Sequence, residues 1–174
     1  MRMFDPTIFE NLKVGIENYI YDLETIEQVV QITNRKDQVD MSIMSRHFGL
    51  EFHLANKNKV TAEIILDASI KDLAEEILEA PAGNPGCRLL LQFTLQIEEI
   101  QTQCEQIETI LLSIWAPILP PEQTISFVYG KKENKYMNSS KVMFDHKINE
   151  EHMEDIPEFV DHVLETLRAL NNVN

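Results

Sequence analysis

Long stretches in which apolar and polar residues alternate constrain the fold of this chain more than any other feature. Residues 49–55 and 60–68 alternate in one phase and are separated by Asn-Lys-Asn-Lys, a turn-forming run in which asparagine tolerates positive φ. The apolar members of the two stretches are Leu50, Phe52, Leu54, Val60, Ala62, Ile64 and Leu66. This pattern predicts a β-hairpin. Residues 88–97 alternate in the same way and predict another half-buried strand.

The remaining elements are predicted from the same two periodicities. Alternation predicts strands over residues 11–23, 123–130 and 141–148, with polar loops over 34–40 and 131–140. Residues 26–33 are ambiguous, because their β-branched residues favour a strand while their spacing also suits a helical turn. Apolar residues spaced by three and four predict helices over 69–80, 99–116 and 156–170, with Ser69 as an N-cap.

These elements indicate an α+β protein. Hairpins favour a mainly antiparallel sheet, and half-polar strands indicate that one face of it is covered. A chain of 174 residues fits one domain, and no linker divides it. We therefore predict a single two-layer domain over residues 1–174, in which a sheet of about five to seven strands has three amphipathic helices packed on one face.

The charge of the chain bears on its partners. The formal net charge is −14, which opposes binding to phosphate backbones and anionic membranes, so we expect neither nucleic acid nor membrane as a partner. Residues 150–165 contain seven acidic residues and no Lys or Arg. One basic stretch has tyrosines interleaved, namely Tyr129, Lys131, Lys132, Lys135, Tyr136, Lys141 and Lys147. Nucleic-acid binding would use such residues, but we expect these lysines to keep a hairpin and an edge strand in solution.

The cysteines and the N-terminus bear on the compartment. Cys87 and Cys104 have no zinc-ligand spacing, and we expect buried free thiols, although a disulfide between them stays open. Asp5 and Pro6 stand where a signal peptide would need an apolar run, and no apolar stretch approaches the ~20 residues of a membrane span. We therefore expect a cytoplasmic protein.

Residues 145–155 hold the densest set of metal-ligand types in the chain. His146, Glu150 and His152 are the candidate ligands, provided that His152 lies on a loop that folds back. Their spacing matches neither H-E-x-x-H nor an EF-hand loop. The alternative is structural, because carboxylates before and within the first turn of a helix complement the helix dipole. We favour the structural interpretation and predict no metal.

Residues 40–49 gather the side-chain types of a nucleophilic site, namely Asp40, Ser42, Ser45, Arg46 and His47. A Ser-His-Asp relay depends on geometry that sequence neighbours seldom achieve, and the chain has no G-x-S-x-G elbow. No glycine-rich phosphate loop is present either. We therefore predict a loop or strand end here, no catalytic residue and no cofactor.

The leading functional hypothesis is a non-catalytic, intracellular adaptor or regulatory protein that binds another protein. Its acidic last helix would receive a basic partner through Glu151, Glu154, Glu158, Asp161 and Glu165. The apolar stripe of residues 99–116 could extend into the seam of a homodimer. The alternatives are a metal-dependent hydrolase that uses His146, Glu150 and His152, and an acidic chaperone-like protein for one client.

Overall fold

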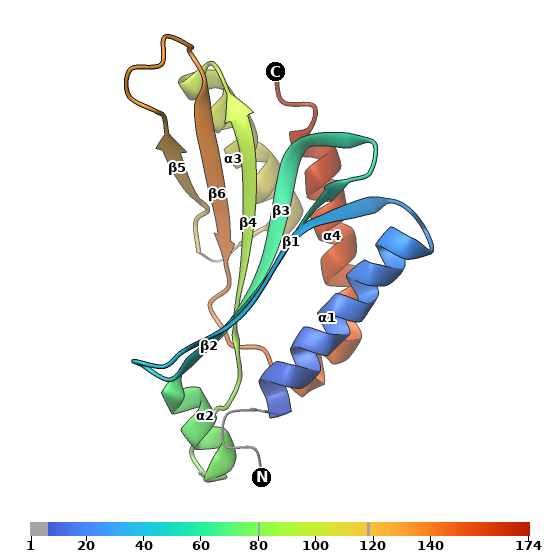
Figure 1. Cartoon of the computed structure of the whole chain (residues 1–174), viewed down its shortest axis with the longest axis vertical. Coiled ribbons are helices and arrows are strands. Elements are labelled where there is room, and N and C mark those ends of the chain that lie inside the picture. Colours follow the sequence, from blue (N-terminus) through green and yellow to red (C-terminus); the bar gives the residue numbers. More distant parts are fainter. Residues whose placement is uncertain (1–6, 80, 118) are drawn as a thin grey trace.

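A computed structural model describes residues 7–79, 81–117 and 119–174, so Asp5 and Pro6 lie outside the described residues. The described chain forms an α+β fold built on one antiparallel sheet (Figure 1). Its helices are α1 (Thr7–Thr25), α2 (Ile70–Ile77), α3 (Ile100–Trp115), the 3-10 helix η1 (Glu150–Asp155) and α4 (Ile156–Leu170). Its strands are β1 (Val30–Asp40), β2 (Ser45–Leu54), β3 (Lys57–Ala68), β4 (Arg88–Ile97), β5 (Glu122–Ser126) and β6 (Tyr136–Met143).

The six strands are hydrogen-bonded in the order β1-β2-β3-β4-β6-β5, and every pair is antiparallel. Helices α1, α3 and α4 cover one face of the twisted sheet, which confirms the predicted two layers (Figure 1). Helix α2 lies beyond the end of β3, and only Asp72 and Leu73 of its residues are buried. The other face of the sheet carries mainly polar side chains, and no helix of the described residues covers it.

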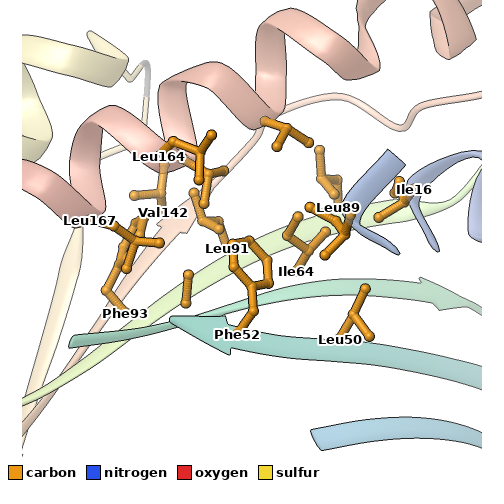
Figure 2. Close-up of a cluster of buried hydrophobic side chains, with 14 of the residues drawn as sticks. Ile16, Leu50, Phe52, Ile64, Leu89, Leu91, Phe93, Val142, Leu164 and Leu167 are labelled. Carbon is orange, nitrogen blue, oxygen red and sulfur yellow. The ribbon is translucent and has the colours of Figure 1, made fainter. Parts of the chain in front are cut away.

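The core lies between one face of the sheet and helices α1, α3 and α4, and the register of the central strands places large and small side chains next to one another. Phe52 pairs with Ala62, and Ala62 pairs with Phe93, so a small side chain separates two large rings across three strands. Leu164 and Leu167 of α4 approach this layer from the helix side (Figure 2). The alternation that predicted the hairpin and the strand over 88–97 is confirmed, because β3 and β4 bury one phase only and β2 departs from this only at Gly49.

The strand predicted over residues 11–23 is wrong, because this segment belongs to helix α1. The residues that α1 buries are Phe9, Leu12, Lys13, Ile16, Ile20 and Leu23, which follow helical spacing. The alternating set chosen from the sequence included Val14, which is 45% exposed. Leu12 and Ile16 fit both the strand period of two and the helix period of 3.6. Only the full set of buried residues from Phe9 to Leu23 distinguishes the helix from a strand.

The loop predicted over residues 34–40 is also wrong, because these residues extend β1 to Asp40, while the strand expected within 26–33 begins at Val30. This part of β1 is an edge strand with few apolar side chains, so it lacks a hydrophobic pattern. Ion pairs position it instead. Arg35 pairs with Glu17 of α1 at 2.5 Å, and Lys36 pairs with Glu63 of β3 at 3.0 Å.

The last hairpin is shifted relative to its prediction. The strand expected over 123–130 ends at Ser126, and residues 136–140 of the predicted loop belong to β6. Beyond Met143 the return strand expected over 141–148 continues only as an isolated bridge between Ile148 and Cys87. Asn138 and Ser140 are fully buried beneath α3, where Asn138 donates to Gln123 Oε1 at 2.8 Å. Buried polar residues of this kind resemble a loop in sequence.

Candidate functional site

An acidic stripe runs along the exposed side of η1 and α4. Its members, Glu151, Glu154, Glu158, Asp161 and Glu165, are all exposed and follow one another at spacings of three and four. The opposite side of α4 is buried against the sheet and the neighbouring helices. None of the five carboxylates forms an ion pair or a side-chain hydrogen bond within the described part of the chain. The five residues predicted from the sequence therefore lie together on one face.

An aromatic hollow adjoins this acidic stripe where the end of α3 meets the first half of α4. Its volume is about 260 Å³, and its lining residues are Ile114, Trp115, Asp155, Glu158, Phe159 and His162. The Trp115 ring lies 5.6 Å from the Phe159 ring and 5.7 Å from the His162 ring, measured between centroids. The Trp115 indole donates to Thr166 Oγ1 at 3.0 Å, which holds the ring in place. Aromatic rings and the carboxylates of Asp155 and Glu158 therefore line the same hollow.

The unpaired acidic stripe contrasts with the carboxylates between α1 and the β1-β2 edge of the sheet. Asp37 accepts hydrogen bonds from Lys13 and Arg46, each at 2.9 Å. Burial alone would raise the pKa of Asp37, but these two cations and their hydrogen bonds outweigh it and lower that pKa below its usual value. Burial alone would lower the pKa of Lys13, but hydrogen bonds and charges from Glu10 and Asp37 outweigh it and raise that pKa above its usual value. Acids in this region stabilise the fold, whereas those of the stripe have no such partner.

The negative field of the acidic stripe reaches a neighbouring helix. Burial, and after it the charges of Asp161 and Glu27, raise the pKa of Tyr19 on α1. Within the stripe, Glu154 and Glu158 are four apart, as are Asp161 and Glu165, and like charges at this spacing destabilise a helix. Dipole complementation explains acids in the first turn of α4 but does not extend to Asp161 and Glu165.

The three residues considered as metal ligands have separate hydrogen-bond partners. The rings of His146 and His152 lie 6.0 Å apart, but the Glu150 carboxylate accepts a hydrogen bond from Asn11 Nδ2 at 2.5 Å. His152 Nδ1 accepts the Asn149 N–H at 3.1 Å and so serves as part of the cap of η1. Within residues 7–79, 81–117 and 119–174, no three or more His, Cys, Asp or Glu side chains are grouped so that they could hold a metal ion.

Residues 40–49 form the end of β1, a turn and the start of β2. His47 Nδ1 lies 2.6 Å from Asp67 Oδ1, a pairing that the sequence analysis missed because Asp67 is on the adjacent strand. Ser42 instead hydrogen-bonds Asp40, at 2.5 Å from its hydroxyl. Arg46 pairs with Glu10 and Asp37, each at 2.9 Å. A His-Asp pair is therefore present, but the hydrogen bonds of the described residues bring no serine to His47.

The lysines of the basic stretch do not form one surface. Lys147 pairs with Asp72 of α2, and Lys135 pairs with Glu133 at 3.3 Å. Lys141 lies within β6, opposite Gln92 of β4. The remaining members of the stretch lie in or beside the exposed segment between β5 and β6, which includes Tyr129, exposed to 96%.

The sequence predicted the acidic stripe but not the aromatic hollow. Counting charges at spacings of three and four finds the stripe, because its members lie on two elements that follow one another in the chain, η1 and α4. The hollow joins Trp115 to Phe159 and His162, which are more than forty residues away in the chain. Trp115 therefore looked like one more core residue of its helix. A contact between α3 and α4 would have been needed to place these rings together.

Comparison with known proteins adds no family. No family model, curated protein or solved structure matches this chain. Among the helices of the described residues, none is both long enough and apolar enough to cross a bilayer. The fold and the surfaces above are therefore the basis of any functional proposal.

Proposed function

We propose that this chain is a non-catalytic adaptor or regulatory protein whose acidic stripe receives a basic segment of a protein partner. The observation that carries the proposal is the set of five exposed carboxylates on one face of η1 and α4, none with a counter-charge in the described part of the chain. Complementary charge across an interface steers association and selects partners. An acidic partner or a phosphate backbone would be repelled by this face.

The energetics favour a role in binding over a role in folding. Like charges four apart on a helix are unfavourable by about 0.2–0.5 kcal/mol per pair. Some acids in other parts of the chain are paired, as Glu10 is with Lys13 at 2.8 Å and with Arg46 at 2.9 Å. A basic partner would relieve the repulsion within the acidic stripe and supply the missing counter-charges.

The test is binding of a fluorescein-labelled, arginine-rich peptide to the purified protein, measured by fluorescence anisotropy at near-physiological salt. The stripe variant carries Glu154→Gln, Glu158→Gln, Asp161→Asn and Glu165→Gln. Each lost pair at an exposed site is worth about 0.2–1 kcal/mol, so binding should weaken by roughly tenfold or more.

The matched control removes the same charge from other places. It carries Asp22→Asn, Glu98→Gln, Glu108→Gln and Glu122→Gln, four exposed acids outside the acidic stripe whose side chains form no ion pair or hydrogen bond with other described residues. This control should weaken binding by no more than about threefold, through the net charge alone. Equal loss in the two variants would refute the proposal. A chaperone-like protein for one client would use the same face, so the same pair of variants tests it.

We also propose that two copies of the chain associate through α2. The apolar residues Ile70, Ile77 and Leu78 are exposed by 56%, 41% and 75%, although the helix is amphipathic. Two-fold pairing of identical patches is the commonest way to cover such a surface. Sedimentation velocity should give a dimer for the natural chain and a monomer for Ile77→Ser with Leu78→Ser. The exposed Lys71→Ser serves as the control, and a natural chain that sediments as a monomer would contradict the idea.

A further inference from the structure

A second cavity adjoins the aromatic hollow. Its volume is about 220 Å³, and it opens between α1, the segment after β6, and the start of α4. It is lined mainly by apolar side chains that include Phe144, Ile148 and Ile156. Asp155 and Phe159 line both spaces, so the two cavities are neighbours at these residues. Each is smaller than the ~300–1,000 Å³ that is usual for a small-molecule site and is better matched to a single side chain.

We propose that the aromatic hollow binds an arginine side chain of the partner, and that the adjoining cavity binds an apolar side chain next to that arginine. This inference rests on the proposed function and names the chemistry that the acidic stripe recognises. The partner segment would therefore contain an apolar residue and an arginine as close neighbours, within a basic surrounding that the rest of the stripe attracts.

The lining of the hollow favours a guanidinium group. Arginine stacks on aromatic faces and pairs with carboxylates through a planar set of donors, and it is less strongly hydrated than lysine. The hollow supplies both requirements, since Trp115 and Phe159 provide rings while Asp155 and Glu158 provide carboxylates. The hydrogen bond from Trp115 to Thr166 fixes the indole before a ligand arrives, which lowers the entropy lost on binding.

The same chemistry already holds an arginine inside this protein. The Arg46 guanidinium lies 4.7 Å from the centroid of the Phe9 ring. It donates to the carboxylates of Glu10 and Asp37, both at 2.9 Å. One aromatic face and two carboxylates thus contact the guanidinium of Arg46, a residue that is 8% exposed. The hollow presents the same set of groups with the cation missing from the described part of the chain.

The only tryptophan of the chain lines the hollow, so its fluorescence reports on this site directly. The probes are four capped tetrapeptides, Gly-Leu-Arg-Gly, Gly-Leu-Lys-Gly, Gly-Leu-Gln-Gly and Gly-Gly-Arg-Gly. The Leu-Arg peptide should change the Trp115 emission saturably. The lysine peptide should bind at least threefold more weakly, and the glutamine and Gly-Arg peptides at least tenfold more weakly.

Two variants with equal charge separate the hollow from the general field of the acidic stripe. Glu158→Arg places a cation at the hollow, whereas Glu165→Arg makes the same change about two turns away on the same exposed face. Both positions are exposed, so both variants should fold. Glu158→Arg should abolish the response to the Leu-Arg peptide, and Glu165→Arg should weaken it by no more than about threefold.

Each result that differs from these expectations would refute a specific part of the proposal. Equal loss in the two variants would mean that the field alone binds the peptide, which refutes the hollow and leaves the proposed function standing. Equal affinity for the lysine peptide would refute the choice of arginine, and equal affinity for the Gly-Arg peptide would refute the apolar neighbour. If no tetrapeptide affects Trp115 while the longer arginine-rich peptide still binds the stripe, only this inference fails. If the longer peptide does not bind either, the proposed function fails as well.

Discussion

Asp37 joins three elements at once, because it lies on β1 and accepts hydrogen bonds from Lys13 of α1 and Arg46 of β2, both at 2.9 Å. Its pKa is lowered in the folded protein, as those two cations outweigh its burial. A carboxylate with a lowered folded pKa adds stability above its unfolded pKa of about 3.9, and this stability is lost as the pH falls through the folded value. The contribution is therefore present at neutral pH and disappears in acid.

We predict that Asp37→Asn lowers the free energy of unfolding at pH 7 by about 1–3 kcal/mol, since it removes one of the two carboxylate charges that pair with the partly buried Lys13 and Arg46. The natural chain should then lose more stability than the variant between about pH 5 and pH 2, and the two should converge. Urea unfolding across that range measures both effects. Asp22→Asn, an exposed change on α1, is the control and should follow the natural chain throughout. If the free energy of unfolding of the natural chain and that of Asp37→Asn fell in parallel as the pH is lowered, this explanation would be wrong.

The two cysteines should differ in reactivity, because their surroundings differ. Burial, followed by the charges of Asp72, Glu76 and Asp67, raises the pKa of Cys87 to about 12, and this side chain is 1% exposed. Cys104 is only partly buried, and both thiols are free. Since the thiolate is the reactive form, we expect iodoacetamide at pH 8 to alkylate Cys104 at least a hundredfold faster than Cys87. Peptide mass spectrometry measures the two rates, and similar rates in the folded protein would contradict the prediction, whereas similar rates in denaturant are expected.

At the scale of elements, the position of α1 depends on a close approach at Gly15. A Cβ atom built at this position would lie 2.6 Å from the end of the Met153 side chain and 3.0 Å from Ile156 Cδ1. Met153 is flexible and can move, and alanine favours a helix over glycine by about 1 kcal/mol. We therefore predict that Gly15→Ala changes the stability by less than about 1 kcal/mol, whereas Gly15→Leu lowers it by about 1–3 kcal/mol through overpacking.

Thermal and urea unfolding of the two Gly15 variants decide between these outcomes. The exposed neighbour Val14→Leu is the control, since its side chain lies on the outer side of α1, and it should be close to neutral. A Gly15→Leu variant as stable as the natural chain would show that α1 does not pack against η1 and α4 at this distance.

The elements that the sequence predicted correctly are those whose two faces differ in environment. Each of β2, β3 and β4 has a buried and a polar face, so period-two alternation was sufficient. The first helix was missed because Leu12 and Ile16 satisfy both periods. The charged half of β1 was missed because it is an edge strand positioned by ion pairs such as that of Arg35 with Glu17, and ion pairs between distant residues leave no periodic signal.

The features of the candidate site also divide into those that the sequence predicts and those that it does not. The acidic stripe lies on consecutive elements, η1 and α4, and could be predicted from helical spacing and charge. The aromatic hollow, the pairing of His47 with Asp67 and the separation of Glu150 from the two histidines all depend on contacts between elements. Such contacts follow from strand order and helix packing, which the sequence analysis left open.

At the scale of the whole molecule, the distribution of acids leads to a prediction about stability. Asp161 and Glu165 are like charges four residues apart on α4 and form no ion pair in the described chain. Both lie beyond the first turn of the helix, so the helix dipole does not stabilise them. Glu10 and Glu17 carry the same charge on α1, but they pair with Lys13, Arg46 and Arg35. Neutralising Asp161 and Glu165 changes the net charge by as much as neutralising Glu10 and Glu17. A difference in stability between the two double variants must therefore come from the local partners of these acids.

We predict that Asp161→Asn with Glu165→Gln raises the free energy of unfolding by about 0.5 kcal/mol at low ionic strength, because it relieves repulsion and breaks no ion pair. The gain should vanish near 1 M salt, where the Debye length is about 3 Å. Glu10→Gln with Glu17→Gln should instead lower stability by about 1–3 kcal/mol at both ionic strengths, since it removes carboxylate charges that pair with Lys13, Arg46 and Arg35. Urea unfolding at the two salt concentrations gives all four values. Destabilisation by the Asp161 and Glu165 pair would mean that these acids support the fold, and the case for a binding role of the acidic stripe would then lose its energetic basis.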